Sequence, residues 1–70
     1  MRIKKTKAQI DTEIAGMRRV IEVHKWAAVR LRERWAGHSF LDTMIERNQV
    51  TIEGLEREIG LAESERRLAS

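Results

Sequence analysis

The stretch RWAGHSFLD, Arg34–Asp42, contains the strongest break in a chain that otherwise has the character of helix. Gly37 can adopt the left-handed backbone conformation that ends a helix. Ser39 can cap a following helix, and Asp42 would complete an acidic variant of the capping box. The stretch therefore predicts a tight turn at residues 37–39, with one helix on each side of it.

Working outward from this turn, the chain contains a second capping-box pattern in Thr6 and Gln9. The first helix is therefore expected at about residues 7–36, and the second at about residues 40–68. Residues 1–6 would form a basic N-terminal arm. The absence of proline and a charged fraction of 36% suit long exposed helices and disfavour a sheet.

Apolar residues recur in both helices at alternating steps of four and three, which is the period of a coiled-coil seam. In the first helix the series is Ile10, Ile14, Met17, Ile21, His24, Ala28, Leu31 and Trp35. In the second it is Leu41, Ile45, Asn48, Ile52, Leu55, Ile59 and Ala62. With Ile14 and Ile45 at heptad position a, folding at Gly37 places an a residue opposite a d residue throughout, from Trp35 opposite Leu41 to Ile10 opposite Arg66. The sequence thus predicts an all-α, antiparallel, coiled-coil-like two-helix hairpin.

Two members of this seam are polar, His24 and Asn48, and they fall in adjacent layers. A buried polar residue can set the register of paired helices at a cost in stability, and the two residues could bond each other or a water. Protonation of His24 could also make the hairpin sensitive to acid. We expect no metal site, because His38 lies in the turn, far from His24.

The charges are divided between the two halves of the sequence. Residues 1–36 carry ten basic and four acidic residues, a net +6, and residues 37–70 carry four basic and seven acidic residues, a net −3. In an antiparallel hairpin the e rows of the two helices flank the same side of the seam. Arg32 is therefore expected to meet Asp42, and Arg18 to meet Glu56.

A chain of 70 residues rarely gains more than about 3–5 kcal/mol from its own core. Cysteine is absent, so no disulfide can add to this stability. Apolar residues outside the seam suggest a second contact surface. We expect two hairpins to form a homodimeric four-helix bundle, with self-association through Val20, Ala27, Met44 and Thr51.

Trp26 is the best candidate for a contact with a protein partner. Aromatic and arginine side chains dominate protein interfaces, and Arg30 lies one turn from Trp26. The candidate partner-binding residues are Val23, Trp26, Val29, Arg30, Leu61 and Leu68. The alternative is that Trp26 covers a second layer of the dimer. The chain is thus expected to be a small protein-binding or regulatory module, or else a structural subunit of a larger assembly.

Nucleic-acid binding is the main rival interpretation, because the basic face of the first helix and the arm could contact phosphates. The candidate residues are Arg2, Lys4, Lys5, Lys7, Arg19, Arg30, Arg34 and Arg47. In size and architecture the chain also resembles the small dimeric helical hairpins that bind RNA and control plasmid copy number. A solvated basic face is the simpler interpretation of the same residues.

The segment TIEGLEREIGLAESERRL resembles the helix-turn-helix of bacterial repressors in Leu55, Ile59, Gly60 and Leu61. This resemblance would imply a turn at Gly60 and DNA binding. The segment departs from that pattern, with Glu56 where a small residue is needed and Arg66 where the recognition helix needs an apolar one. Because the seam continues through Gly60, a continuous helix is expected instead.

No pattern in the sequence indicates catalysis or a cofactor. The three serines, Ser39, Ser64 and Ser70, fall at a cap, at a surface position and at the last residue, with no base placed to activate them. No apolar run has the length of a signal peptide or a membrane span. The chain is therefore expected to be a cytoplasmic protein, not an enzyme, that binds no membrane.

Overall fold

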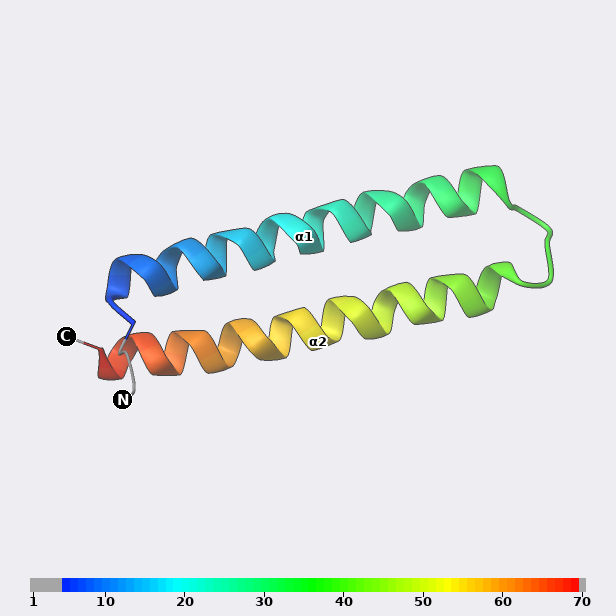
Figure 1. Cartoon of the computed structure of the whole chain (residues 1–70). Helices are drawn as coiled ribbons and strands as arrows, with labels where there is room; N and C mark the ends of the chain where they lie inside the picture. The colour runs from blue at the N-terminus through cyan, green and yellow to red at the C-terminus, as the bar shows by residue number, and fades with distance from the viewer. Residues whose placement is uncertain (1–4, 70) are drawn as a thin grey trace.

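The computed structural model describes residues 5–69, which form two helices packed against each other. Helix α1 spans Lys7–Arg34 and helix α2 spans Leu41–Leu68. They run antiparallel in a rod of 52 × 19 × 15 Å, with the start of α1 beside the end of α2 (Figure 1). The predicted all-α hairpin is confirmed over this range. Of the predicted basic arm, only Lys5 and Thr6 lie within the described residues.

The start of α1 has the predicted cap. The Thr6 hydroxyl accepts a hydrogen bond from the Gln9 backbone N–H at 3.2 Å, and the Gln9 side chain accepts one from the Thr6 backbone N–H at 2.8 Å. This reciprocal pair satisfies two backbone donors that would have no partner inside the helix. The residue types at Thr6 and Gln9 are therefore sufficient to locate the first turn of α1.

The turn differs in detail from the prediction. Gly37 adopts the expected positive φ of 84°. However, α1 ends at Arg34 and α2 begins at Leu41, so the connection is longer than residues 37–39. The prediction that Ser39 caps α2 is wrong: Phe40 occupies the N-cap position and makes no side-chain capping bond. Backbone bonds close the turn instead, among them Leu41 N–H to the His38 carbonyl at 3.1 Å.

The core extends from the terminal end of the hairpin to its middle. Its buried residues are Ile10, Ile14, Ile21, Ile52, Ile59 and Ala62. Met17, Leu55 and Ala69 pack against this cluster. The seam residues nearer the turn are only half-buried: Ala28, Leu31, Trp35, Leu41 and Ile45. The predicted seam is therefore present, but it is well buried over only about half of its length.

Helix α2 is continuous through Gly60, as the seam predicts. A Cβ atom added at Gly60 would meet nothing within 4 Å, so no close packing contact requires glycine at this position. The turn implied by the resemblance to a repressor helix-turn-helix is absent from residues 41–68. That resemblance therefore does not extend to the structure.

The polar layer of the seam is formed by one hydrogen bond between the helices. The Asn48 side-chain amide donates to the backbone carbonyl of His24 at 2.8 Å. The His24 ring does not bond Asn48; its Nδ1 lies 2.9 Å from the Val20 carbonyl of the same helix. The contact thus joins adjacent layers as predicted, but it uses the backbone of His24 and not its side chain.

The ion pairs between the helices differ from the predicted ones. Arg18 lies 3.8 Å from Glu63, one heptad further along α2 than Glu56. The predicted pair of Arg32 and Asp42 is not formed. Arg66, placed opposite Ile10 in the predicted seam, turns outward and donates two hydrogen bonds to the Asp11 carboxylate, at 2.5 and 3.2 Å. Long side chains can reach past the nearest register position, so heptad letters alone do not determine their partners.

Candidate functional site

Two surfaces outside the seam have the character of contact sites, and the first is a shallow groove on the outer side of α1. We call it the Trp26 surface; its lining residues are Arg19, Glu22, Val23, Trp26, Ala27 and Arg30. All six come from one helix, where residues three, four and seven apart share a side. The period of the helix therefore brings together most of the partner-binding residues proposed from the sequence on α1.

The Trp26 surface is strongly exposed. Trp26 is 66% exposed and Val23 is 61% exposed, and the neighbouring Val29 is also exposed. Trp26 occupies heptad position f, which points directly away from the partner helix α2. The hairpin's own packing therefore leaves a large aromatic side chain in water.

Two cations flank this apolar surface. Arg19 and Arg30 line the groove with Trp26, and within residues 5–69 neither has a carboxylate at ion-pair distance. An arginine beside an aromatic side chain offers both stacking and planar hydrogen bonds. The combination is suited to a ligand that presents apolar groups next to carboxylates or phosphates.

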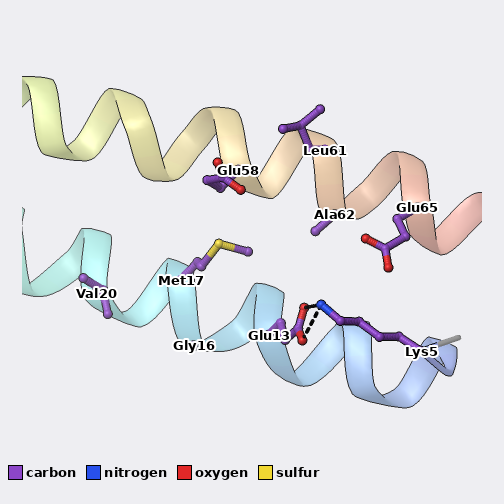
Figure 2. A pocket seen from close by; sticks show the side chains of 9 residues that line it. All are labelled: Lys5, Glu13, Gly16, Met17, Val20, Glu58, Leu61, Ala62 and Glu65. Carbon is purple, nitrogen blue, oxygen red and sulfur yellow. Dashed lines mark hydrogen bonds and ion pairs between the residues drawn. The ribbon is translucent and has the colours of Figure 1, made fainter. Parts of the chain in front are cut away.

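The second surface is a groove between the helices near the ends of the chain (Figure 2). Its apolar part is formed by Gly16, Met17, Val20, Leu61 and Ala62, and its charged residues are Lys5, Glu13, Glu58 and Glu65. Lys5 crosses the groove end and bonds the Glu13 carboxylate at 3.0–3.1 Å. This hydrogen bond, with the Glu13 charge, raises the pKa of the Lys5 ammonium above its usual value.

The remaining residues proposed from the sequence are scattered. Leu61 lines the second groove, but Leu68 is 90% exposed and lines neither groove, so the two leucines share no pocket. Of the proposed self-association residues, Val20 lies in the second groove and Ala27 in the Trp26 surface. Thr51 lies further toward the turn, where its hydroxyl donates to the Arg47 carbonyl at 3.1 Å. Met44, half-buried, is closer still to the turn.

The proposed nucleic-acid residues differ in their surroundings within the described part of the chain. Arg2 and Lys4 lie outside it, and Lys5 is paired with Glu13. Arg34 lies with its guanidinium 5.8 Å from the Trp35 ring centroid. Arg47 is on α2, in a groove with Thr43, Glu46, Val50 and Thr51. Lys7 is exposed in the first turn of α1.

An aromatic cluster at the turn was not predicted from the sequence. The rings of Trp35, His38 and Phe40 lie 5.1–5.3 Å apart between centroids, and both contacts of Trp35 are edge-on. Such arrangements stabilise aromatic pairs beyond simple area burial. The signal was present in the close spacing of three rings around Gly37, but only the turn geometry shows that they meet.

No group of three or more His, Asp or Glu side chains in residues 5–69 is placed to hold a metal ion. The Ser64 hydroxyl donates to the Gly60 carbonyl at 3.2 Å and accepts from Arg67. Neither described helix has a stretch apolar enough, over the required length, to cross a membrane.

Comparisons with protein-family models, with curated proteins and with solved structures each gave no significant match. The function of the hairpin must therefore be inferred from its own surfaces. These offer exposed apolar area, one prominent aromatic side chain and unevenly distributed charge, which are features of association with other molecules.

Proposed function

We propose that this chain is a non-catalytic, protein-binding module that assembles as a homodimer and contacts another protein through the Trp26 surface. The observation that carries the proposal is the position of Trp26, which is 66% exposed on the side of α1 that faces away from α2. Tryptophan and arginine supply much of the binding energy at protein interfaces, because they bury a large area and keep a polar group. Val23, Val29 and Arg30 extend this contact area.

Self-association is supported by the small size of the core. Only six described residues are buried, all of them in one part of the hairpin, and eight large apolar side chains are exposed. Burial of Val20, Ala27, Met44 and Thr51 against a second hairpin would supply part of the missing apolar contact. Sedimentation that finds a stable monomer of 8.2 kDa at micromolar concentration would contradict the dimer.

The test of partner binding compares Trp26→Ala with Val50→Ala. Val50 is a matched control, because it is 63% exposed on α2 and remote in sequence from the Trp26 surface. Each tagged variant is used to capture proteins from the native host, with and without nuclease, and bound proteins are identified by mass spectrometry. We expect a nuclease-resistant partner that the unmodified chain and Val50→Ala retain and Trp26→Ala loses.

The oligomeric state of Trp26→Ala must be measured in the same experiment. If the variant loses the partner and stays dimeric, Trp26 contacts that partner directly. If the variant becomes monomeric, Trp26 belongs to the dimer interface, which is the alternative raised by its size and position. Retention of every partner by a dimeric Trp26→Ala variant would overturn the proposed binding surface.

The second candidate function is RNA or DNA binding, and one observation favours it. Arg19, Arg30 and Arg47 have no ion-pair partner within the described residues, so their charges are available to phosphates. The affinity for a labelled oligonucleotide should then fall steeply with salt, and the logarithm of the binding constant should decrease linearly with the logarithm of the salt concentration. An apolar contact through Trp26 would persist at the same salt concentrations.

A further alternative is a structural subunit of a larger assembly. In that case the exposed apolar residues, including Val50, Leu61 and Leu68, would be buried against unlike chains. Purification of the native assembly would then recover the hairpin with fixed stoichiometry. Alanine at Val50 would release it as readily as alanine at Trp26, which distinguishes this alternative from the proposed function.

A further inference from the structure

One side of the hairpin carries opposite charges at its two ends. This side, which we call the groove side, contains heptad positions c and g of both helices. Near the terminal end of the hairpin the charged residues at these heptad positions are all acidic: Glu13, Glu58 and Glu65, which line the groove between the helices together with Lys5, the partner of Glu13 (Figure 2). Toward the turn, the charged residues at the same heptad positions are all basic: Arg30, Arg34 and Arg47.

The two sides of the hairpin differ in whether ion pairs join α1 to α2. On the opposite side, cations of one helix meet carboxylates of the other: Arg18 lies 3.8 Å from Glu63, and Arg66 bonds Asp11. On the groove side, no ion pair joins α1 to α2 within residues 5–69; the one pair there is between Lys5 and Glu13, at the start of the chain. Apart from the pair of Lys5 and Glu13, the charges of the groove side are therefore not matched inside a single hairpin.

We propose that the occupant of the groove side is a second copy of this chain, turned end to end about a two-fold axis that crosses the middle of both helices. This arrangement stacks α1 on α1 and α2 on α2, each pair antiparallel, and it rests on the self-association proposed above. The g row of α1 supports it directly. From the start of the helix this row reads Glu13, Val20, Ala27, Arg34, which is acidic, apolar, apolar, basic.

Reversing this row against itself produces complementary contacts. Arg34 faces Glu13 of the partner subunit, and Val20 faces Ala27 of the partner subunit; each contact occurs twice because a two-fold interface repeats every pair. On α2, Arg47 comes opposite the acidic end that contains Glu58 of the partner subunit. Gly54 lies next to the axis, and because glycine has no side chain, two α2 helices can approach closely there.

The other two-fold arrangement, with both turns at the same end, is unfavourable. It would place the basic ends of the two copies together and the acidic ends together. Like charges across an interface are repulsive and suppress the wrong pairing. The distribution of charge on the groove side therefore selects the end-to-end orientation.

The proposed dimer leaves Trp26 itself accessible, although Val23, Ala27 and Arg30 of the Trp26 surface lie at heptad positions c and g, on the groove side. Successive residues are about 100° apart around a helix, so position f, which holds Trp26, lies roughly at right angles to the middle of the groove side. Trp26 would remain at the outer edge of the bundle. Partner binding would then use Trp26, Arg19 and Val29, which lie at heptad positions f and b, outside the groove side.

The experiment uses two charge-reversed variants of the full chain. The acidic variant carries Arg34→Glu and Arg47→Glu, and the basic variant carries Glu13→Lys and Glu58→Lys. Each alone would place like charges at both ends of its dimer, so we expect its dimer dissociation constant to rise by at least about tenfold. An equimolar mixture restores every opposite-charge contact, and we expect a heterodimer about as stable as the unmodified dimer.

Sedimentation equilibrium, with circular dichroism to check helix content, measures these outcomes. Heterodimer formation by two variants that do not self-associate supports the orientation. If both variants dimerise as well as the unmodified chain, the orientation is wrong although the proposed self-association stands. If the unmodified chain is monomeric, the proposed self-association is overturned. This result would not bear on partner binding through Trp26, which is tested separately.

A single cysteine provides a second readout that does not depend on charge. Val23 lies next to the proposed axis, so Val23→Cys should form an intermolecular disulfide under mild oxidation, because two copies of the residue come close together. Val20→Cys is the matched control on the same helix. In the proposed dimer the two copies of this cysteine are offset along the helix by seven residues, about 10 Å, which is too far for a disulfide. Equal cross-linking of both variants, or of neither in a dimeric protein, would overturn the proposal.

Discussion

The end of the hairpin that holds the chain termini and the end that holds the turn share one heptad pattern but are packed differently. All six buried residues occupy seam positions between the terminal end and the middle of the hairpin, where Ile21 and Ile52 lie, and five of the six are isoleucine. In the turn half, seam residues such as Leu31, Leu41 and Ile45 remain half-buried. A regular heptad repeat therefore does not guarantee uniform burial along two paired helices.

The difference has a physical source in the residues of each half. Five successive layers of the predicted seam, from Ile10 opposite Arg66 to His24 opposite Ile52, each contain one isoleucine, and these branched side chains fill the space between the helices. At the border of the turn half the seam contains the small Ala28 and the polar Asn48, which bury less apolar area. The turn half is held instead by the bond from Asn48 to His24 and by the aromatic contacts of Trp35 with His38 and Phe40.

The strongest test of this contrast replaces one isoleucine in each half of α2. Ile59 and Ile45 both occupy heptad position a, but Ile59 is buried and Ile45 is half-buried. Ile59→Ala should lower the free energy of unfolding by about 2–5 kcal/mol, because it removes buried methyl groups and leaves a cavity. Ile45→Ala should lower the free energy of unfolding by clearly less than Ile59→Ala does. Urea unfolding at one protein concentration measures both, and equal losses would contradict the proposed difference in packing.

The next effect concerns two glycines with opposite roles. Gly37→Ala should destabilise the turn by about 1–2 kcal/mol, because the backbone there has a φ of 84° that a side chain disfavours. Gly60→Ala should stabilise α2 by about 1 kcal/mol, since Gly60 is exposed inside a helix and an added Cβ meets nothing. Thermal unfolding of both variants checks the signs; stabilisation by Gly37→Ala would mean that the turn is not tight.

A smaller loss is expected at the border between the two halves. Asn48→Ala removes the 2.8 Å hydrogen bond to the His24 carbonyl and should lower the free energy of unfolding by about 0.5–1.5 kcal/mol. Gln49→Ala serves as the control, because Gln49 is exposed and bonds only the exposed Glu53 of its own helix. Chemical unfolding compares them, and an equal effect of the two substitutions would show that the Asn48 bond adds nothing to the seam.

The smallest effect is a dependence on pH in the terminal half. The hydrogen bonds from Arg66 hold the pKa of the Asp11 carboxyl below its usual value. A carboxyl with a lowered pKa in the folded state stabilises the fold at pH values above its unfolded-state pKa, about 3.9, and loses this contribution as pH falls through the folded value.

Asp11→Asn should therefore lower the urea midpoint at pH 7, and the difference from the unmodified chain should shrink as the pH falls below about 4. Since the pair is exposed, 0.5 M salt should reduce the difference at pH 7 as well. The matched control is Glu22→Gln, which breaks only the exposed pair with Lys25 of the same helix. A difference for Asp11→Asn that stays constant across this pH range would show that its charge has no role.

Residue spacing was sufficient to predict much of this fold. The unbroken steps of four and three predicted two helices and their continuation through Gly60, and Thr6 with Gln9 predicted the first cap. The cap at Ser39 was wrong, because backbone bonds to His38 and Trp35 close this turn without a side-chain acceptor. The ion pairs of Arg18 and Arg66 were also missed, since long side chains choose among several carboxylates within reach.

Of the two candidate surfaces, one could be predicted from residue spacing and the other could not. The exposure of Trp26 and Val23 follows from their heptad positions, which face away from the seam, so sequence spacing predicted it. The groove between Val20 and Leu61 joins residues from two helices, and its existence depends on how closely those helices pack. Periodicity cannot give that distance, because it describes each helix separately.

By itself, the sequence determined that the chain forms two antiparallel amphipathic helices and which sides of them are apolar, because helix geometry repeats every 3.6 residues whatever surrounds it. Only the tertiary structure decided that the core is concentrated in the terminal half and which carboxylate each arginine contacts. It also decided that Glu13, Glu58 and Glu65 gather in one groove. These features depend on distances between segments far apart in the chain, which local spacing does not specify.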